Sequence, residues 1–284
     1  MILVTGAAGK TGRAVIRALT AQQKPVRALV RKHQQIDLMK ALGAGSVVVG
    51  DMRSREVLQE SLRGIQSVYY ICPNVHPEEL VIGRTLLETA RTAGIERFVY
   101  HSVLHPQIEA MPHHWLKMRV EEAIFVSGIP FTILQPAAYM QNILVHWDRI
   151  TGEGAYPIPY GPETKMSMVD LADIAETAAR VLSEAGHEGA IYELCGPEVL
   201  SQTEVANIIA KKLDRSVRIK TIPISEWELK ARKSGMSDYQ IKTLVRMFEY
   251  YDRYGFCGNS RVLENLLGCP PARLEKFIER TIPQ

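Results

Sequence analysis

The chain opens with the stretch MILVTGAAGKTG, residues 1–12, and this stretch decides the fold. An apolar run, Ile2–Val4, leads into a turn in which Gly6, Gly9 and Gly12 stand three residues apart, and a helical pattern follows. In such a unit the first glycine permits the tight turn, the second lets the backbone approach a pyrophosphate, and the third lets the helix pack closely. The first N–H groups of the helix have no intrahelical partner and point toward phosphates. The stretch therefore predicts a dinucleotide-binding loop.

The residues expected to bind the nucleotide in this loop are Gly6, Ala8, Gly9, Lys10, Thr11 and Gly12. The tripeptide at residues 9–11 also looks like the end of a Walker A loop. That motif requires a glycine at the position of Val4, inside the strand, so we reject it. A glycine-rich turn of an unrelated α/β protein is the remaining alternative.

Farther along the chain, short runs rich in Val, Ile and Tyr alternate with amphipathic helical stretches. Strands are predicted at Ile2–Val4, Val26–Val30, Ser46–Val49, Ser67–Cys72, Arg97–His101, Phe131–Leu134 and Ala190–Leu194. Helices are predicted at Thr11–Ala21, Ile36–Leu42, Glu56–Leu62, Glu78–Ala93, His114–Val126 and Leu171–Ala185. This alternation predicts an α/β fold with a doubly wound parallel sheet of the Rossmann type and helices on both faces.

The pattern changes after residue 150. Residues 152–162 form a loop rich in Gly, Pro and Tyr, and the chain becomes mostly helical after Cys195. We expect a dinucleotide-binding domain over 1–150, to which 165–190 return. Residues 151–164 and 191–284 then form a smaller, mostly helical C-terminal lobe that covers a substrate cleft.

Composition excludes several classes of protein. At 284 residues the chain can bury an ample core, and its four cysteines form no C-x-x-C pair, so neither a disulfide framework nor a metal site is expected. A formal net charge of +3 without a basic stripe argues against nucleic acid as a partner. The first strand begins at residue 2 and no apolar stretch is long enough to span a bilayer. We expect a cytoplasmic protein with no membrane association.

Ligands of an open α/β sheet bind beyond the carboxyl ends of its strands. Arg31 and Lys32 follow the second strand, where an enzyme selective for NAD usually presents Asp or Glu. Cations at this place favour NADP, whose extra phosphate they can bind. The alternative is a pair of solvated basic side chains.

Three other strands end in candidate cofactor-binding residues. Asp51 follows the third strand and could accept a hydrogen bond from the adenine amino group, or simply serve a turn. Cys72 and Pro73 follow the fourth, near the expected nicotinamide, and Ser102 follows the fifth. Cys72 fits a packing role better than a nucleophilic one, because no base lies nearby in the sequence.

At this point the chain resembles the NmrA-like family of atypical short-chain dehydrogenases/reductases over nearly its whole length. The resemblance rests on residues 6–12 with Arg31, on 117–121 (KMRVE), on 128–136 (GIPFTILQP), on 139–142 (YMQN) and on 166–170 (MSMVD). It implies an NADP(H)-binding domain and a small C-terminal lobe. Some family members reduce quinones, dyes, imines or other small molecules, and others sense the redox state of the cofactor and regulate a partner.

The chain departs from ordinary short-chain dehydrogenases at one catalytic motif. Ordinary short-chain dehydrogenases carry Tyr-x-x-x-Lys, in which the lysine lowers the pKa of the tyrosine. Here His113 stands at the tyrosine position, four residues before Lys117, which argues against alcohol oxidation. Lys117 can still hold the nicotinamide ribose and pair with Glu121, and His113 could donate a proton. The alternative for His113 and His114 is a solvent-exposed pair at the helix entry.

Further residues are ambiguous. Gln135 stands where many family members carry arginine, which puts an anion contact there in doubt. Tyr139 is a third catalytic candidate and could line the cleft with Asn142, but an aromatic residue would also suit the entry to the second lobe. Asp170 fits the N-cap of the helix that follows it. The aromatic run at residues 247–256 fits a core better than a ligand wall.

Two functions remain open on these grounds. The first is an NADP(H)-dependent oxidoreductase, with NAD(H) as a possible second cofactor, that transfers hydride to a small conjugated acceptor of the quinone, dye or imine class. The second is a non-catalytic NADP(H) redox-sensing regulator that acts through a protein partner or an oligomer. A nucleotide-sugar epimerase is disfavoured because its chemistry normally needs the missing tyrosine.

Overall fold

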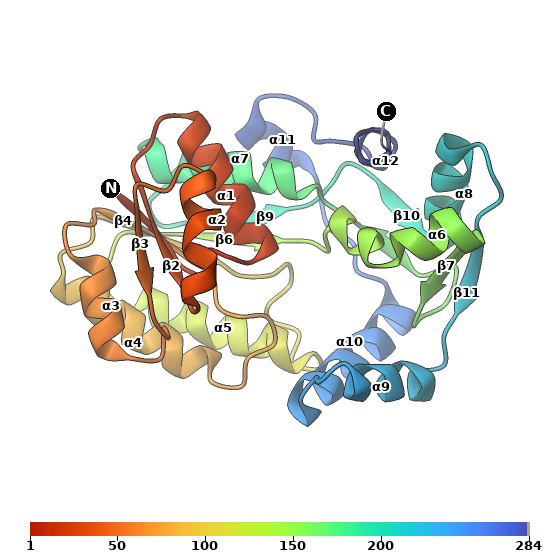
Figure 1. The fold of residues 1–284 in the computed structure, drawn as a ribbon, viewed down its shortest axis with the longest axis horizontal. Coiled ribbons are helices and arrows are strands. Elements are labelled where there is room, and N and C mark those ends of the chain that lie inside the picture. The colour runs from red at the N-terminus through yellow and green to blue at the C-terminus, as the bar shows by residue number, and fades with distance from the viewer. Residues whose placement is uncertain (283–284) are drawn as a thin grey trace. The chain divides into compact units, whose positions relative to one another are not determined.

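The computed structural model describes residues 1–282, which form two compact units (Figure 1). The first unit comprises Met1–Gln107, His113–Gln135 and Ile174–Tyr192. The second comprises Ile108–Pro112, Pro136–Asp173 and residues 193–282. The chain therefore passes between the units several times.

The first unit is built on one seven-stranded sheet. Its strands are β1 (Ile2–Val4), β2 (Val26–Val30), β3 (Ser46–Val49), β4 (Ser67–Tyr70), β5 (Arg97–His101), β6 (Phe131–Pro136) and β9 (Ala190–Leu194). They lie in the order β3-β2-β1-β4-β5-β6-β9, and every neighbouring pair from β3 to β6 is parallel. The order 3-2-1-4-5-6 is that of the Rossmann fold, so the predicted fold class is confirmed.

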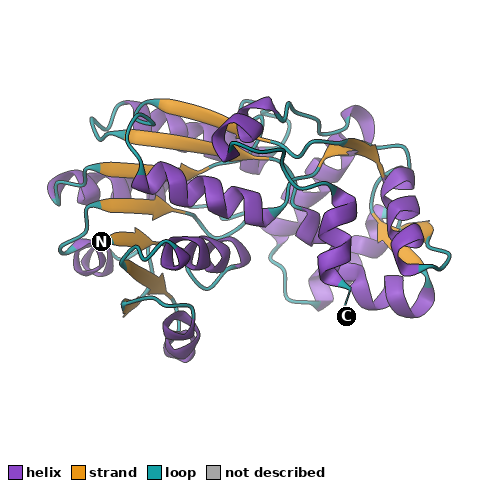
Figure 2. Ribbon diagram, turned by 90° about the horizontal axis from the view of Figure 1, so that it is seen from above, coloured by secondary structure: helices purple, strands orange, loops and turns teal. Residues whose placement is uncertain are grey.

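Helices cover both faces of this sheet (Figures 1 and 2). They are α1 (Lys10–Ala21), α2 (Ile36–Ala41), α3 (Arg55–Leu62), α4 (Glu79–Thr92), α5 (Pro112–Phe125) and α7 (Leu171–Ser183), with the short 3₁₀ helix η1 (His33–Gln35) before α2. In Figure 1, α1, α2 and α7 lie on one face and α3, α4 and α5 on the other. The central strands are consequently buried on both sides, as the fully buried run Val68–Tyr70 of β4 shows.

The predicted strands match the observed ones closely; β6 runs to Pro136, two residues beyond the expected end, and the other exceptions have local causes. β4 ends at Tyr70, two residues earlier than expected, because the Ile71 N–H donates to the hydroxyl of Thr5 at 2.9 Å and not to a neighbouring strand. α5 begins at Pro112, two residues earlier than expected. Proline suits the first turn of a helix, where no N–H is required.

The second unit is mostly helical, as expected, but it also contains four short strands. Its helices are η2 (Met140–His146), α6 (Trp147–Glu153), α8 (Gln202–Leu213), α9 (Ile224–Lys233), α10 (Asp238–Tyr254), α11 (Arg261–Leu267) and α12 (Leu274–Thr281). The strands β7 (Ala155–Ile158) and β11 (Arg218–Thr221) pair in parallel, and β8 (Lys165–Ser167) and β10 (Val199–Ser201) pair antiparallel. The expected loop at 152–162 is thus wrong in part, since β7 lies within it.

The boundary between the units also differs from the expected one. Residues 136–150 and 165–173 belong to the second unit. The reason is a backbone pairing: the Met140 N–H donates to the Val169 carbonyl at 2.9 Å, and the Val169 N–H donates to the Ala138 carbonyl at 2.9 Å. These bonds join the chain after β6 to the segment before α7.

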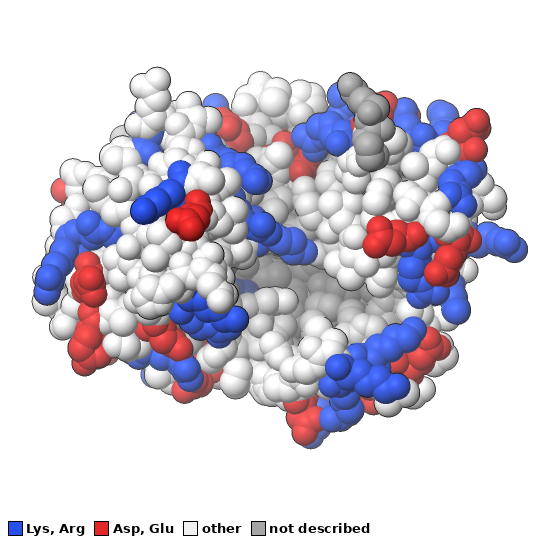
Figure 3. Space-filling model, in the orientation of Figure 1, with Lys and Arg blue, Asp and Glu red and all other residues white. Residues whose placement is uncertain are grey.

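The surface of the protein carries charges of both signs, interspersed on the face that Figure 3 shows. No helix within residues 1–282 is both long enough and apolar enough to cross a bilayer.

Candidate functional site

The glycine loop lies between β1 and α1, and its three glycines are needed for different reasons. Gly6 has φ +54°, a left-handed conformation that favours glycine. A Cβ on Gly12 would lie 2.5 Å from the Gly6 carbonyl oxygen and 2.7 Å from the Ala7 Cα, so the helix could not approach the loop so closely. A Cβ on Gly9 would meet only the Gly6 oxygen, at 3.2 Å, and Gly9 is exposed. Its missing side chain leaves the entrance to α1 open.

The start of α1 provides donors for an anion. Gly9 is the N-cap residue and, as a glycine, offers no side chain to cap the helix; the first turn carries no acidic residue. Lys10 stands exposed at this end, Ala8 is half-buried, and Thr11 faces the core. The first N–H groups of a helix have no intrahelical partner, and together with the positive end of the helix dipole they favour a phosphate here.

Arg31 and Lys32 are both exposed directly after β2, as a phosphate-binding pair requires. Asp51 follows β3, and its carboxylate makes hydrogen bonds other than the adenine contact considered above. Its carboxylate accepts from the Arg53 backbone N–H at 2.9 Å and from the Arg53 Nη2 at 2.7 Å. The hydrogen bonds from Arg53 lower the pKa of Asp51 to about 2. This geometry fits the turn alternative.

Cys72 is buried in the core between the sheet and the helices α3 to α5, with 6% of its surface exposed. Burial raises the pKa of its thiol to about 12, so the thiol stays protonated near neutral pH. The structure supports the packing alternative for this residue. Pro73, next to it, is exposed.

Lys117, on α5, pairs with a residue that the sequence did not suggest. Its Nζ lies 2.7 Å from the Oε1 of Glu79, in the first turn of α4. The expected pairing with Glu121 is wrong as a direct contact, since that carboxylate bonds elsewhere. The only signal for Glu79 in the sequence was its place at the start of the helix that follows β4.

Glu121 instead belongs to a buried polar cluster with Ser102, directly after β5, and Gln135, within β6. It accepts a short hydrogen bond from the Ser102 hydroxyl, and Gln135 Nε2 lies 3.0 Å from each of its carboxylate oxygens. Only 2% of Glu121 is exposed, and burial raises the pKa of its carboxyl. The Gln135 side chain therefore donates its hydrogen bonds to the Glu121 carboxyl, and as a neutral amide it brings no positive charge to it.

The two histidines at the start of α5 are buried, so the expected solvent-exposed pair is wrong. His113 is 7% exposed and His114 is fully buried, with the rings edge to face at 4.5 Å. Burial, assisted by His114 and Lys117, lowers the pKa of His113 to about 2. A neutral imidazole is not an acid at neutral pH, so the reason for assigning the proton to His113 is lost.

These histidines predict a pH-dependent stability. Burial lowers the pKa values of His101, His113 and His114 to about 3, 2 and 4, below the ordinary 6.5. Below pH 6.5 the unfolded chain therefore binds protons that the folded chain does not. The free energy of unfolding consequently decreases as the pH is lowered. Each histidine contributes a slope approaching about 1.4 kcal/mol per pH unit. Urea unfolding between about pH 7 and pH 5 measures this slope. His33→Gln, which removes an exposed histidine, should leave it unchanged, and a flat profile would contradict the buried, neutral state.

The remaining catalytic candidate, Tyr139, lies in the second unit. It is half-buried, forms a β-bridge with Val169 and precedes η2. Asn142, in η2, is exposed. The expected N-cap role of Asp170 is confirmed, because its Oδ1 accepts from the Ala172 N–H at 3.0 Å.

The aromatic run at residues 247–256 packs mainly inside the second unit. Phe248, Tyr251 and Phe256 are buried, and Tyr251 stacks on Phe256 at 4.7 Å. The core interpretation of this run is confirmed for these three rings.

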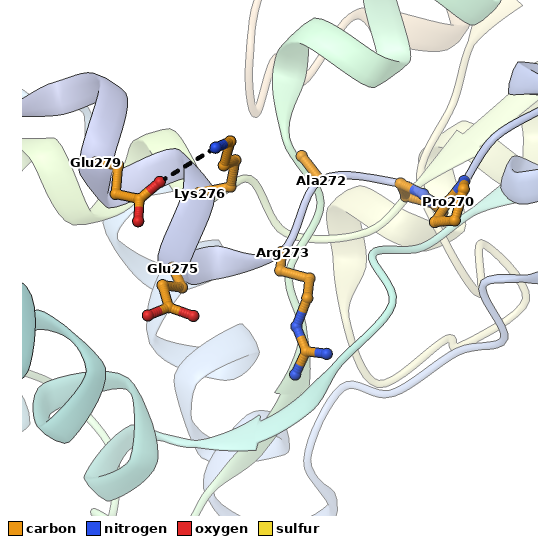
Figure 4. Close-up of a pocket in the computed structure, with 7 residues that line it drawn as sticks. Pro270, Ala272, Arg273, Glu275, Lys276 and Glu279 are labelled. Carbon is orange, nitrogen blue, oxygen red and sulfur yellow. Dashed lines mark ion pairs between the residues drawn. The ribbon is translucent and has the colours of Figure 1, made fainter.

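A hollow on the second unit holds none of the predicted site residues (Figure 4). It is lined by Pro270, Pro271, Ala272, Arg273, Glu275, Lys276 and Glu279. Its charged side chains neutralise one another in part, with Lys276 Nζ 3.4 Å from Glu279. Within residues 1–282, no group of three or more His, Cys, Asp or Glu side chains is placed to hold a metal ion.

Comparison with known proteins identifies the class. The fold and the glycine loop define a dinucleotide-binding α/β protein, and the model of the NmrA-like family matches residues 1–282. The chain belongs to the NmrA-like family.

Similar proteins include two reductases, and the crystal structure of one of them is known. The chain is 32% identical over 240 residues to the NAD(P)H azoreductase of Xenophilus azovorans, covering 84% of this chain and 82% of that one. It is 26% identical to quinone oxidoreductase 2 of Escherichia coli, over 98% and 97% of the two chains. The crystal structure of NADPH-dependent quinone oxidoreductase QOR2 from Escherichia coli in complex with NADPH superposes with a TM-score of 0.85, at 26% identity and 99% coverage of both chains.

Proposed function

We propose that this protein is an NADP(H)-dependent oxidoreductase that transfers hydride to a small conjugated acceptor of the quinone or dye class. The observation that carries the proposal is the open N-terminus of α1 behind the glycine loop. The relatives named above support it, since both are reductases that use a nicotinamide nucleotide or act on a quinone by name. The redox-sensing regulator gains no support from them.

The residues present fit this cofactor. The backbone of residues 6–12 offers N–H donors and no carboxylate, which suits a pyrophosphate. Arg31 and Lys32 offer exposed cations for the additional phosphate of NADP, so we expect NADP(H) to bind more tightly than NAD(H). Lys117 is assigned to the nicotinamide ribose. Asp51, Cys72, Pro73 and Ser102 stay candidate contacts at the adenine and nicotinamide ends.

When bound, the reduced cofactor supplies the hydride. The protein then has to orient the acceptor, exclude water and allow one proton to reach the product. His113 is unsuited to that proton, because burial lowers its pKa to about 2. We assign the proton to Tyr139 or to water. Reduction of a quinone or an azo group depends less on a precisely placed proton donor than reduction of a ketone does.

The proposal is tested by calorimetric titration of the protein with NADPH, NADP⁺, NADH and NAD⁺ in one buffer. We expect NADPH to bind most tightly, and we expect the protein to consume NADPH with a benzoquinone or an azo dye as acceptor. Failure of all four nucleotides to bind would overturn the proposal. Binding of NADPH without turnover of any acceptor would restore the regulator hypothesis.

Reversal of the charge at residue 31 tests the cofactor preference. Arg31→Asp is expected to weaken NADPH binding about 30-fold, or 2 kcal/mol, because a carboxylate replaces the partner of the extra phosphate. NADH, which lacks that phosphate, should bind nearly unchanged. Lys40→Asp, the same reversal at an exposed lysine of α2, is the control for general electrostatics. Equal losses for NADPH and NADH would contradict the assignment of Arg31.

A further inference from the structure

A buried carboxylate lies beside the lysine assigned to the cofactor. Glu79 is 1% exposed, and its Oε1 accepts from Lys117 Nζ at 2.7 Å and from the Tyr100 hydroxyl at 3.0 Å. The Lys117 side chain is 13% exposed. Three elements contribute to this contact: α4, α5 and the end of β5.

Stability alone is a poor explanation for this pair. Taking both charges out of water costs several kcal/mol per ion, and apolar replacements of buried pairs are often neutral or stabilising. A glutamate in the first turn of α4 would benefit from the helix dipole while exposed. Glu79 instead turns into the interior, toward an ammonium. This arrangement suits a carboxylate whose role is to hold that ammonium in place.

The hydrogen bonds of Lys117 leave one donor available. An ammonium has three N–H donors. One reaches Glu79, and a second points to the His101 carbonyl oxygen at 3.4 Å. Among residues 1–282 the structure shows no acceptor for a third, and the Tyr100 ring lies 5.5 Å from Nζ. The ring is itself held, because it stacks on Tyr70 at 5.3 Å.

We propose that Glu79 is the positioning residue for Lys117, holding the ammonium so that its remaining N–H donates to the nicotinamide nucleotide. The inference rests on the proposed function, since it presumes that NADP(H) is the ligand. Glu79 itself does not contact the cofactor. Its effect on binding therefore passes through Lys117 and disappears when the lysine is absent.

A double-mutant cycle on NADPH binding tests this dependence, with calorimetry as the readout. Glu79→Gln keeps an oxygen acceptor and nearly the same shape but removes the charge. We expect it to raise the Kd for NADPH about ten-fold when Lys117 is present. In the Lys117→Met background the same change should alter the Kd by less than about two-fold. At saturating NADPH, Glu79→Gln should keep its kcat with a quinone acceptor, while the KM for NADPH rises.

Two further variants complete the experiment. Glu88→Gln removes an exposed carboxylate of the same helix, paired with Arg55 at 2.7 Å, and should bind NADPH as the wild type does. If Glu79→Gln does not fold, Glu79→Asp keeps the charge at a shorter reach and should still weaken NADPH binding about three-fold. Thermal unfolding without nucleotide identifies the folded variants.

The outcomes separate the two proposals. A wild-type protein that does not bind NADPH removes the proposed function, and this inference with it. A wild type that binds NADPH, together with a folded Glu79 variant that binds it equally well, overturns only the role of Glu79. Equal losses from Glu79→Gln with and without Lys117 would show that Glu79 acts independently of the lysine, which also overturns the inference.

Discussion

Gly12→Ala is expected to lower the stability of the protein by about 3 kcal/mol and to weaken NADPH binding by about 100-fold, or 2.7 kcal/mol. The added Cβ would lie 2.5 Å from the Gly6 carbonyl oxygen and 2.7 Å from the Ala7 Cα. Both neighbours are backbone atoms, so no side chain can rotate away. Relief requires α1 to move from the loop, which displaces the N–H groups assigned to the phosphates.

Calorimetry with NADPH and thermal unfolding measure the two effects. A loss of 3 kcal/mol lowers the Tm of a chain of this size by roughly 6–12 °C. Gly152→Ala is the matched control, because Gly152 is exposed in α6 and a Cβ there would meet no described atom within 4 Å. It should stabilise the helix by up to about 1 kcal/mol and leave the Kd unchanged. Wild-type binding by Gly12→Ala would refute the structural role of the third glycine.

Asp170→Ala is expected to reduce stability by about 3–4 kcal/mol, because one buried carboxylate joins three segments of the second unit. Asp170 is 1% exposed and accepts from the Ala172 N–H, from Gln141 Nε2 at 2.8 Å and from the Arg280 guanidinium. These bonds connect the start of α7 to η2 and α12. The Arg280 side chain is 51% exposed, so it remains hydrated and most of the loss comes from the cap and from Gln141.

Urea unfolding of the variant measures this loss. Asp170→Asn keeps an oxygen for the Ala172 N–H but removes the charge, and should lose about half as much. Asp148→Ala is the control, since Asp148 lies exposed in the first turn of α6 and should cost at most about 1 kcal/mol. A loss for Asp170→Ala no larger than that of Asp148→Ala would show that the three contacts contribute little.

Much of the fold could be predicted from local patterns. The strands of the large sheet are buried runs bounded by turns and capping glycines, so their positions follow from composition, and β1, β2, β3, β5 and β9 match residue for residue. The strands of the second unit could not be predicted in the same way. β8 and β10 contain three residues each, too few to show the two-residue period of a strand, and neither leads into a glycine loop as the equally short β1 does.

Side-chain partners were harder to predict than elements. Lys117 was expected to pair with Glu121, four positions away on the same helix, but its partner is Glu79, 38 positions away on another helix. Helical spacing shows which residues share a face and not what that face packs against. The same limit explains the histidines at residues 113 and 114, whose place after a proline suggested exposure.

The sequence by itself determined the doubly wound sheet, the dinucleotide loop and the cations after β2, because periodicity, glycine spacing and position after a strand are local properties of the chain. Only the tertiary structure decided which charges are buried and with whom they pair. Packing between distant elements controls desolvation, and desolvation makes His113 a neutral side chain and Glu79 the partner of Lys117.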